Sequence, residues 1–222
     1  MQVAYGCWVW VPQLPDGLRW SHNSYYHRWL LRQLPSPLDS ALDVGCGAGR
    51  LACTLASRAK QVDAVDASAA MIAGAEQRGS DSSQVRWLVG DVLDRDVPLR
   101  EEGYHAVVAV SSLHHLPLDN GLGRLAGLVR PGGVLAVIGH YRPDTIADRL
   151  VGIVALPANV GVGVALAVIG GGGKPDDDGM PVRPPTATLA EIRQAATRLP
   201  GSTVTRALYW RYLLAWRRAP AH

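Results

Sequence analysis

The chain has 222 residues, a length that fits one ordinary domain with a sizeable hydrophobic core. Hydrophobic residues make up 48% of the chain and charged residues 18%, a composition typical of a globular protein. The formal net charge is +3 and the arginines are scattered along the sequence, which argues against a nucleic-acid-binding surface.

The cysteines and the first residues indicate a cytoplasmic location. Three cysteines, Cys7, Cys46 and Cys53, match no zinc-ligand spacing, and so small and odd a number is typical of a reducing compartment. The opening segment MQVAYGCWVWVP is apolar but has no basic n-region and no A-x-A site, so it is a poor signal peptide. We therefore expect a cytoplasmic protein without a metal site.

Strand-like and helix-like segments alternate through the middle of the chain. The strand-like segments are short and apolar, and they are 41–46, 61–67, 85–91, 104–112 and 134–140. The segments with helical spacing are 49–59, 69–78, which Ser68 can cap, and 123–130, which should stop at 131–133. This alternation predicts a parallel α/β sheet with right-handed crossovers.

The C-terminal part adds one helix and two strands. Thr188 and Glu191 have the spacing of a capping box at the start of a helix over 189–199. Residues 202–218 predict two close strands that form a hairpin at the sheet edge. The predicted fold is a Rossmann-like open sheet, mostly parallel with an antiparallel C-terminal hairpin, and helices cover both faces.

We expect a single domain, 1–222, with four parts. They are an N-terminal cap or lid, a cofactor-binding core, an apolar substrate cap with a linker, and the C-terminal helix and strand pair, over 1–37, 38–142, 143–185 and 186–222.

The segment LDVGCGAGR, residues 42–50, has three alternate glycines directly after the first predicted strand. Ligands of open α/β sheets bind at the carboxyl ends of strands, where glycine-rich turns commonly approach a nucleotide. The spacing is G-x-G-x-G, and Arg50 stands where the last glycine of the dinucleotide fingerprint G-x-G-x-x-G belongs. No tyrosine is followed four residues later by lysine, the pair of short-chain dehydrogenases. Both features disfavour a nicotinamide oxidoreductase.

Two carboxylates end the next two strands. Asp66 follows the first glycine by about 20 residues, a spacing at which a carboxylate accepts hydrogen bonds from ribose hydroxyls. Asp91 ends the third strand, where it can reach an adenine amino group. Contacts for adenosine without a good phosphate cradle fit S-adenosylmethionine.

The chain resembles class I S-adenosylmethionine-dependent methyltransferases. The matching segments occur in the family's order across roughly residues 40–142, and they are LDVGCGAGR, VDAVDASAAMI, VGDVLD, SSLHHLP and LVRPGGVLAVIGH. The segments SHNSYYHRWLLRQLP and LYWRYLLAWRR also resemble a subgroup of small bacterial methyltransferases. The resemblance implies an enzyme whose cofactor is S-adenosylmethionine.

The resemblance also implies roles for individual residues. The glycines approach the methionine part of the cofactor, Asp43 orders their loop and the amino group, Asp66 binds the ribose, and Met71 packs on the adenine. The cofactor-binding residues it implies are Tyr26, Asp43, Gly45, Gly47, Gly49, Asp66, Met71, Asp91, Val92 and Ser111. The alternative for the glycines is a tight turn that binds nothing.

Three histidines follow the fourth and fifth strands and are the candidate bases. A sulfonium methyl is already activated, so the protein must mainly position the acceptor, and a hydroxyl acceptor also needs a base. His114 and His115 lie in SSLHHLP, which faces the transferring methyl in the resembling family, and His140 ends the fifth strand. The alternative is that these side chains form hydrogen bonds that hold the loop.

Aromatic residues and histidines crowd the start of an amphipathic helix in residues 21–35. We expect this helix to fold over the cofactor, with Tyr26 touching its methionine end. The alternative is a helix that packs on the sheet through ordinary aromatic contacts.

Residues 150–173 carry no charge and are long enough to cross a bilayer. A span would separate the C-terminal strands from the sheet they should join, so we expect no integral membrane span. An apolar cap over the substrate site, followed by a linker at 170–179, is the favoured interpretation. A buried helix pair and a peripheral membrane contact are the alternatives, and an exposed cap would also allow a homodimer.

The predicted function is methyl transfer from S-adenosylmethionine to a small-molecule acceptor, a hydrophobic bacterial secondary metabolite. The alternative is a protein of the same fold that binds the cofactor and catalyses a rearrangement or cyclisation without methylation.

Overall fold

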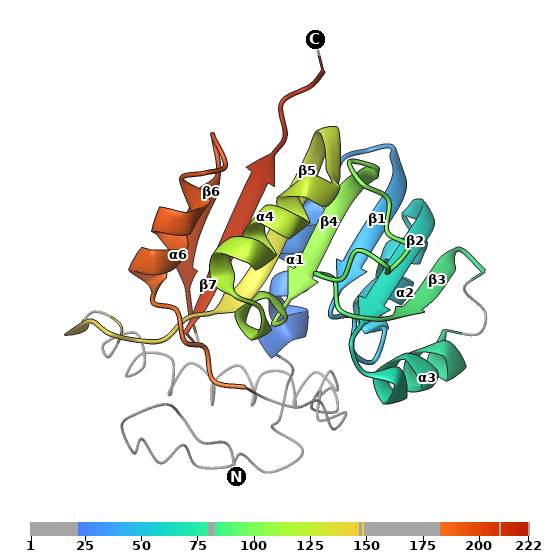
Figure 1. Cartoon of the computed structure of the whole chain (residues 1–222), viewed down its shortest axis with the longest axis horizontal. Helices are drawn as coiled ribbons and strands as arrows, with labels where there is room; N and C mark the ends of the chain where they lie inside the picture. The colour runs from blue at the N-terminus through green and yellow to red at the C-terminus, as the bar shows by residue number, and fades with distance from the viewer. Residues whose placement is uncertain (1–21, 80–82, 147, 149–182, 209, 222) are drawn as a thin grey trace, which may run out of the picture.

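The computed structural model describes residues 22–79, 83–146, 148, 183–208 and 210–221 (Figure 1). The helices are α1 His22–Gln33, α2 Arg50–Ala56, α3 Ala69–Arg78, the short 3-10 helix η2 Leu113–His115, α4 Leu118–Leu128 and α6 Leu189–Ala196. The strands are β1 Leu38–Val44, β2 Ala59–Asp66, β3 Val85–Val89, β4 Tyr104–Val110, β5 Val129–His140, β6 Thr203–Ala207 and β7 Arg211–Arg217.

Within these residues, seven strands form one sheet in the order β3-β2-β1-β4-β5-β7-β6. The pairs among β1 to β5 are parallel, whereas β7 is antiparallel to both β5 and β6. This confirms the predicted fold class, and it puts β7 inside the sheet and β6 at the edge. The strand order reverses between β1 and β4, the position at which open α/β sheets bind ligands.

Helices cover both faces of the sheet (Figure 1). The helices α4 and α6 cover one face and bury Val107 and Ala109 of β4, while α1 and α2 cover the other face and bury Ala106 and Val108. Successive strand residues point to opposite faces, so a strand covered on both sides must be apolar throughout. This is why the β4 sequence is continuously hydrophobic.

Side chains cap two helices as the sequence predicts. The Ser68 hydroxyl accepts a hydrogen bond from the Met71 backbone N–H at 3.3 Å, at the start of α3. At the start of α6, the Thr188 hydroxyl accepts from the Glu191 N–H at 3.2 Å, and the Glu191 carboxylate accepts from the Thr188 N–H at 2.7 Å. Each cap satisfies backbone donors that the first helical turn leaves unpaired.

The predicted end of the helix before β5 is wrong. The helix α4 ends at Leu128, not at residues 131–133, because Val129 already pairs with Tyr104 of β4. The register then shifts between Tyr104 and Ala106, so Pro131, Gly132 and Gly133 lie within an irregular stretch of β5. A pairing with a strand far away in the sequence decides this boundary.

Several predictions lie outside the described residues. They concern the first 21 residues and the apolar segment 150–173 with its linker. The division of the domain into lid, core, cap and C-terminal part stays a prediction for that reason. In the described part of the chain, no helix is both long enough and apolar enough to span a membrane.

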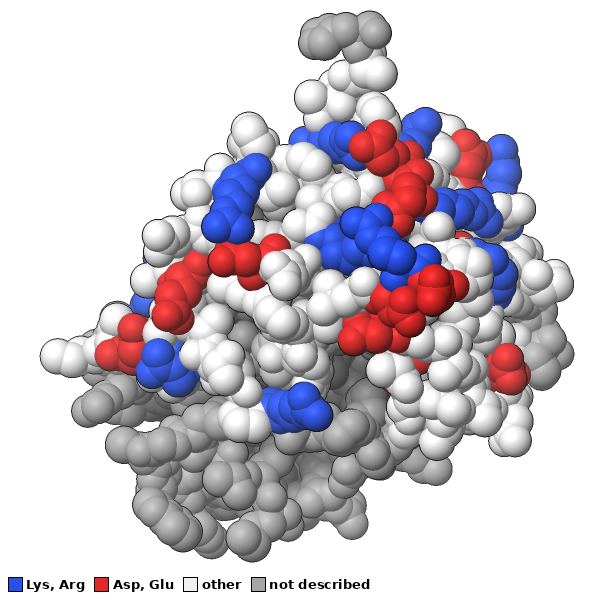
Figure 2. Space-filling view, viewed as in Figure 1, with Lys and Arg blue, Asp and Glu red and all other residues white. Residues whose placement is uncertain are grey.

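Lysine and arginine side chains lie among aspartate and glutamate side chains on the face that α4 covers, and they do not gather by sign (Figure 2). Several form pairs, such as Arg198 with Asp119 at 3.0 Å and Arg95 with Glu101 at 3.1 Å. This mixture matches the small net charge. The absence of a nucleic-acid partner remains a prediction.

Candidate active site

The candidate active site lies where the parallel strands end, at the lower edge of the sheet in Figure 1. The glycine turn follows β1 there, and Gly45, Gly47 and Gly49 all have positive φ, at 68°, 50° and 78°. The N–H groups of Gly45 and Cys46 donate to the Val65 carbonyl at 2.8 and 3.1 Å, which ties the turn to β2. A Cβ atom at Gly45 would lie well inside van der Waals contact with Ser112. The turn therefore needs glycine here for both its conformation and its close packing.

Asp66 orders the glycine turn. One carboxylate oxygen accepts a hydrogen bond from the Gly47 N–H at 2.9 Å, and the other accepts from the Ser68 N–H at 2.9 Å. The end of β2 is thereby connected to the glycine turn and to the start of α3. Each oxygen keeps a further lone pair, so the carboxylate can still accept bonds from ribose hydroxyls.

Asp43 is a buried carboxyl beneath the glycine turn. It is 2% exposed and accepts a hydrogen bond from the Ala52 backbone N–H. Its Oδ2 atom has no partner among the described residues. Burial, and secondarily the charge of Asp66, raises the pKa of Asp43 to about 7. A buried, unpartnered carboxylate oxygen is costly without a ligand, and a cationic amino group would satisfy it.

The predicted adenine contacts lie after β3 and in α3. Asp91 is exposed and its Oδ1 accepts from the Leu93 N–H at 2.9 Å, while Val92 is buried and Met71 partly buried. The Val92 carbonyl accepts a hydrogen bond at 2.8 Å from Arg124, a buried side chain of α4. Nothing in the local sequence pattern around Arg124 predicts this contact.

Tyr26 packs in the core between α1 and the sheet. It is 8% exposed, and its hydroxyl donates to the Leu208 carbonyl at 3.4 Å. These contacts agree with the alternative of a helix packed on the sheet. A contact between Tyr26 and the cofactor stays a prediction.

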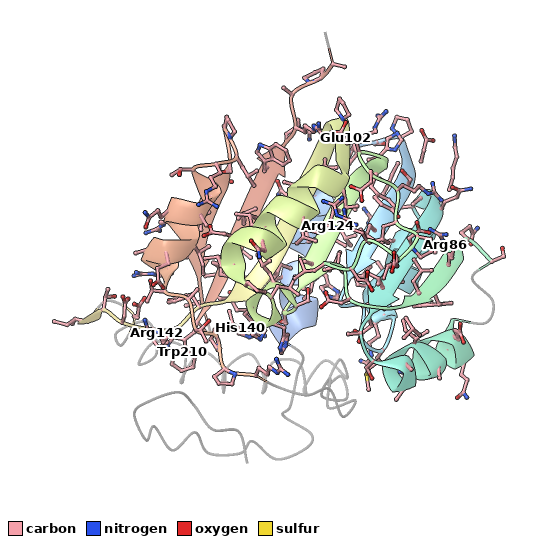
Figure 3. The ribbon with its side chains drawn as sticks, viewed as in Figure 1. Arg86, Glu102, Arg124, His140, Arg142 and Trp210 are labelled. Carbon is pink, nitrogen blue, oxygen red and sulfur yellow. The ribbon has the colours of Figure 1, made fainter. Side chains whose placement is uncertain are left out.

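The three predicted histidines come together at this edge. The ring of His114 lies 4.2 Å from that of His115 and 5.2 Å from that of His140, measured between ring centroids. His140 ends β5 at the lower edge of the sheet, on the opposite side of the molecule from Glu102 (Figure 3).

Burial keeps His114 neutral. Burial first, and then the charges of His115 and Arg211, lowers its pKa to about 4, against a hydrogen bond with the Arg183 backbone that raises it. The Nδ1 atom is buried and has no hydrogen-bond partner among the described residues. In the neutral imidazole with its proton on Nε2, Nδ1 carries a free lone pair that can accept a hydrogen bond. His115 is exposed, and burial and Arg183 lower its pKa while Asp66 opposes them.

Two serines fasten the turn that carries the histidines. The Ser111 N–H donates to the Ile138 carbonyl at 2.7 Å, and its hydroxyl accepts from Arg211 Nη1 at 3.0 Å. The Ser112 hydroxyl donates to the Val44 carbonyl at 2.6 Å, directly before the glycine turn. The histidine turn and the glycine turn are therefore physically connected. Sequence analysis identifies Ser111 through the family resemblance but misses Ser112 and Arg211.

Comparison with known proteins identifies the family. Residues 41–133 match the family model described as "Methyltransferase domain". An uncharacterized methyltransferase of Mycobacterium tuberculosis is 36% identical over 201 residues, which are 89% of this chain and 96% of that protein. Glycine N-methyltransferase of Rattus norvegicus is 34% identical over 156 residues, which are 62% of this chain and 52% of that protein. The chain thus spans about half the length of that second relative.

Solved structures show the same fold. Geranyl diphosphate C-methyltransferase from Streptomyces coelicolor A3(2), crystallised with Mg²⁺, geranyl diphosphate and S-adenosylhomocysteine, aligns with a TM-score of 0.60 at 16% identity. That alignment covers 88% of this chain and 77% of the other. The N-methyltransferase NodS from Bradyrhizobium japonicum WM9, with S-adenosylhomocysteine, aligns with a TM-score of 0.59 at 17% identity over 88% of this chain and 86% of the other.

The chain belongs to the class I S-adenosylmethionine-dependent methyltransferases. It is a methyltransferase, and S-adenosylmethionine is its cofactor. The relatives support methyl transfer rather than the rearrangement that the sequence left open.

Proposed function

We propose that this methyltransferase acts on a small apolar acceptor, and that His114 Nδ1 accepts a hydrogen bond from the nucleophilic group of that acceptor. The observation that carries the proposal is the buried Nδ1 atom of the neutral His114 imidazole, which has no hydrogen-bond partner in the part of the chain that the structure describes. A buried acceptor atom left unpaired costs about 1–3 kcal/mol, which a donor on the acceptor molecule would recover.

The residues of the glycine turn fit the cofactor. Asp43 offers its amino group an oxygen that has no partner among the residues described, and Asp66 offers lone pairs to its ribose. The left-handed glycines allow the protein backbone to approach the cofactor closely. Asp91, Val92, Met71, Ser111 and Tyr26 are the further contacts that we propose. When bound, the cofactor supplies an electrophilic methyl group that needs no further activation.

His114 and His115 have different roles in this proposal. The neutral His114 orients an acceptor hydroxyl or amine and accepts its proton as the methyl group is transferred. With a pKa of about 4, His114 is a weak base, so its main contribution is to orient the nucleophilic group, and it retains the accepted proton only briefly at neutral pH. The exposed His115, with its ring centroid 4.2 Å away, is the nearest histidine that can carry it to solvent. His140 borders the same space from β5.

The apolar character of the acceptor rests on the composition of residues 150–173, which follow β5 and lie outside the described residues. Burying apolar surface of the acceptor against such a segment would contribute about 25 cal/mol per Å². We propose a hydrophobic secondary metabolite as the acceptor. We also propose a homodimer through the same segment and a cytoplasmic location.

The test is release of S-adenosylhomocysteine in the presence of a panel of apolar phenols, alcohols and amines, with glycine included because of the named relative. We expect His114→Ala to lower turnover of a hydroxyl acceptor about a hundredfold or more, with cofactor affinity intact. The control is His105→Ala, because His105 lies at the other end of β4, bonded to Ser40 at 3.0 Å. Equal turnover of His114→Ala and the control would contradict the role of His114.

A further inference from the structure

Arg211 connects β7 to the turn that carries the histidines. It is the first residue of β7 and is 6% exposed. In the antiparallel register of β5 and β7 it stands opposite His140, and its Nη1 atom donates to the Ser111 hydroxyl at 3.0 Å. A buried guanidinium therefore reaches from the last strand across β5 to the end of β4.

The backbone on both sides of this hydrogen bond adopts a conformation that non-glycine residues seldom take. Ser111 has φ of 55° and Trp210 has φ of 52°, and they are two of the three non-glycine residues with positive φ in the described part of the chain. Such a conformation costs about 1–3 kcal/mol and persists where neighbouring contacts hold it, commonly at functional sites. The Trp210 carbonyl accepts from the Tyr141 N–H, directly after His140, at 3.1 Å. Trp210 and His140 both lie near the lower edge of the sheet in Figure 3.

The left-handed Ser111 sets the direction of the following residues. After it, the Ser112 carbonyl accepts from the His115 N–H at 3.0 Å and starts the 3-10 helix Leu113–His115. The position of both histidine side chains therefore depends on the conformation of Ser111. The hydrogen bond from Arg211 engages the hydroxyl, which is the only polar group of the Ser111 side chain.

We propose that Arg211 is a positioning residue of the methyltransferase, which through its hydrogen bond to Ser111 fixes the turn that presents His114 to the acceptor. The inference rests on the proposed role of His114. It adds a residue from β7 to a site whose other members belong to β1 to β5, the turns that follow these strands, α1 and α3.

The positive charge of Arg211 also supports the proposed role of His114, because it lowers the pKa of that imidazole. The groups around His114 are His115 on its own turn, His140 on β5, Arg211 on β7 and the Arg183 backbone. Burial is the first cause of the lowered pKa of His114, and the positive charges of protonated His115 and of Arg211 follow. A positive charge at residue 211 thus favours the neutral imidazole, the form that accepts a hydrogen bond from an acceptor.

Histidine NMR of the full chain with S-adenosylhomocysteine tests this without a known acceptor. In Arg211→Gln we expect the titration midpoint of His114 to rise by about 0.5–1 pH unit, since one nearby cation is lost. In Ser111→Ala the charge stays but the hydrogen bond is lost, so the His114 resonances should move while the midpoint is kept. In Arg211→Lys the midpoint should stay close to that of the parent.

Internal and external controls separate positioning from general destabilisation. His105 reports any global change, because it lies at the far end of β4, and Arg217→Gln removes an exposed arginine from the other end of β7. Unchanged His114 resonances and midpoint in both Arg211→Gln and Ser111→Ala would overturn the proposal. Equal shifts of His114 and His105 would overturn it as well. Both measurements are independent of turnover, so the role of His114 as acceptor of a proton can fail separately.

Discussion

Asp43 should link cofactor affinity to pH, and Asp43→Asn should remove that link. The carboxyl is 2% exposed, and burial together with the charge of Asp66 raises its pKa to about 7. Near neutral pH, a large fraction of the free protein therefore carries protonated Asp43. The cationic amino group of a bound cofactor favours the ionised form, so binding below pH 7 should release a proton.

The size of the effect follows from the pKa. One pH unit below it, ionising the carboxyl costs about 1.4 kcal/mol, which is a tenfold loss of affinity. Above it the cost vanishes and the affinity reaches a plateau. In Asp43→Asn a neutral amide replaces the carboxylate, so binding should be weaker by about 1.5–3 kcal/mol on the plateau and independent of pH.

Calorimetric titration with S-adenosylhomocysteine in two buffers of different ionisation enthalpy gives affinity and proton release together. The range should stay below about pH 7.7, where the ligand's own amino group starts to titrate. Asp39→Asn is the matched control, because that carboxylate lies at the other end of β1 and pairs with Lys60. Equal parent affinities across this range, without proton release, would refute the contact between Asp43 and the amino group.

Three further predictions concern the glycine turn and the histidine cluster. Gly45→Ala should lower the free energy of unfolding by about 2–4 kcal/mol, from left-handed strain plus overlap with Ser112. The control is Gly132→Ala, where φ is 76° and no atom lies within 4 Å of the added Cβ, so the expected cost is about 1–2 kcal/mol. Equal losses of stability for Gly45→Ala and Gly132→Ala in denaturant unfolding would contradict the close packing at Gly45. Asp66→Ala should weaken S-adenosylhomocysteine binding by about 1–3 kcal/mol, and unchanged affinity would exclude the ribose contact. The pKa of His114 is lowered from 6.5 to about 4, so the folded protein resists protonation of this side chain. The free energy of unfolding should therefore fall by about 2–3 kcal/mol as the pH drops from 6.5 to 4. Urea unfolding of His114→Gln should show a smaller loss over the same window, and an equal loss would contradict the burial of a neutral imidazole.

Local patterns in the sequence predict most of this fold. Short apolar runs predict the strands, and the capping pair of Thr188 and Glu191 gives the start of α6 to the residue. The boundary between α4 and β5 could not be predicted, since the pairing of Val129 with Tyr104 and the irregular register after it are tertiary features. Parallel topology then explains why residues predicted separately, at the ends of β1, β2, β4 and β5, meet at one edge.

The supporting contacts of the site lie beyond sequence reasoning for a physical reason. Arg211 reaches Ser111 because β7 pairs with β5 in one particular antiparallel register, and a shift by one residue would turn its side chain to the other face. Arg124 reaches the Val92 carbonyl through the packing of α4 on the sheet. The double role of Asp66, which orders the glycine turn besides offering lone pairs to a ribose, also needs the three-dimensional structure.

The most direct test of the account is a crystal structure of the full chain with S-adenosylhomocysteine. The account predicts the ligand's amino group at Asp43, its ribose at Asp66 and its sulfur facing the cluster of His114, His115 and His140. A ligand whose sulfur faces away from that cluster, or whose adenosine lies elsewhere than between the glycine turn and Asp91, would contradict it.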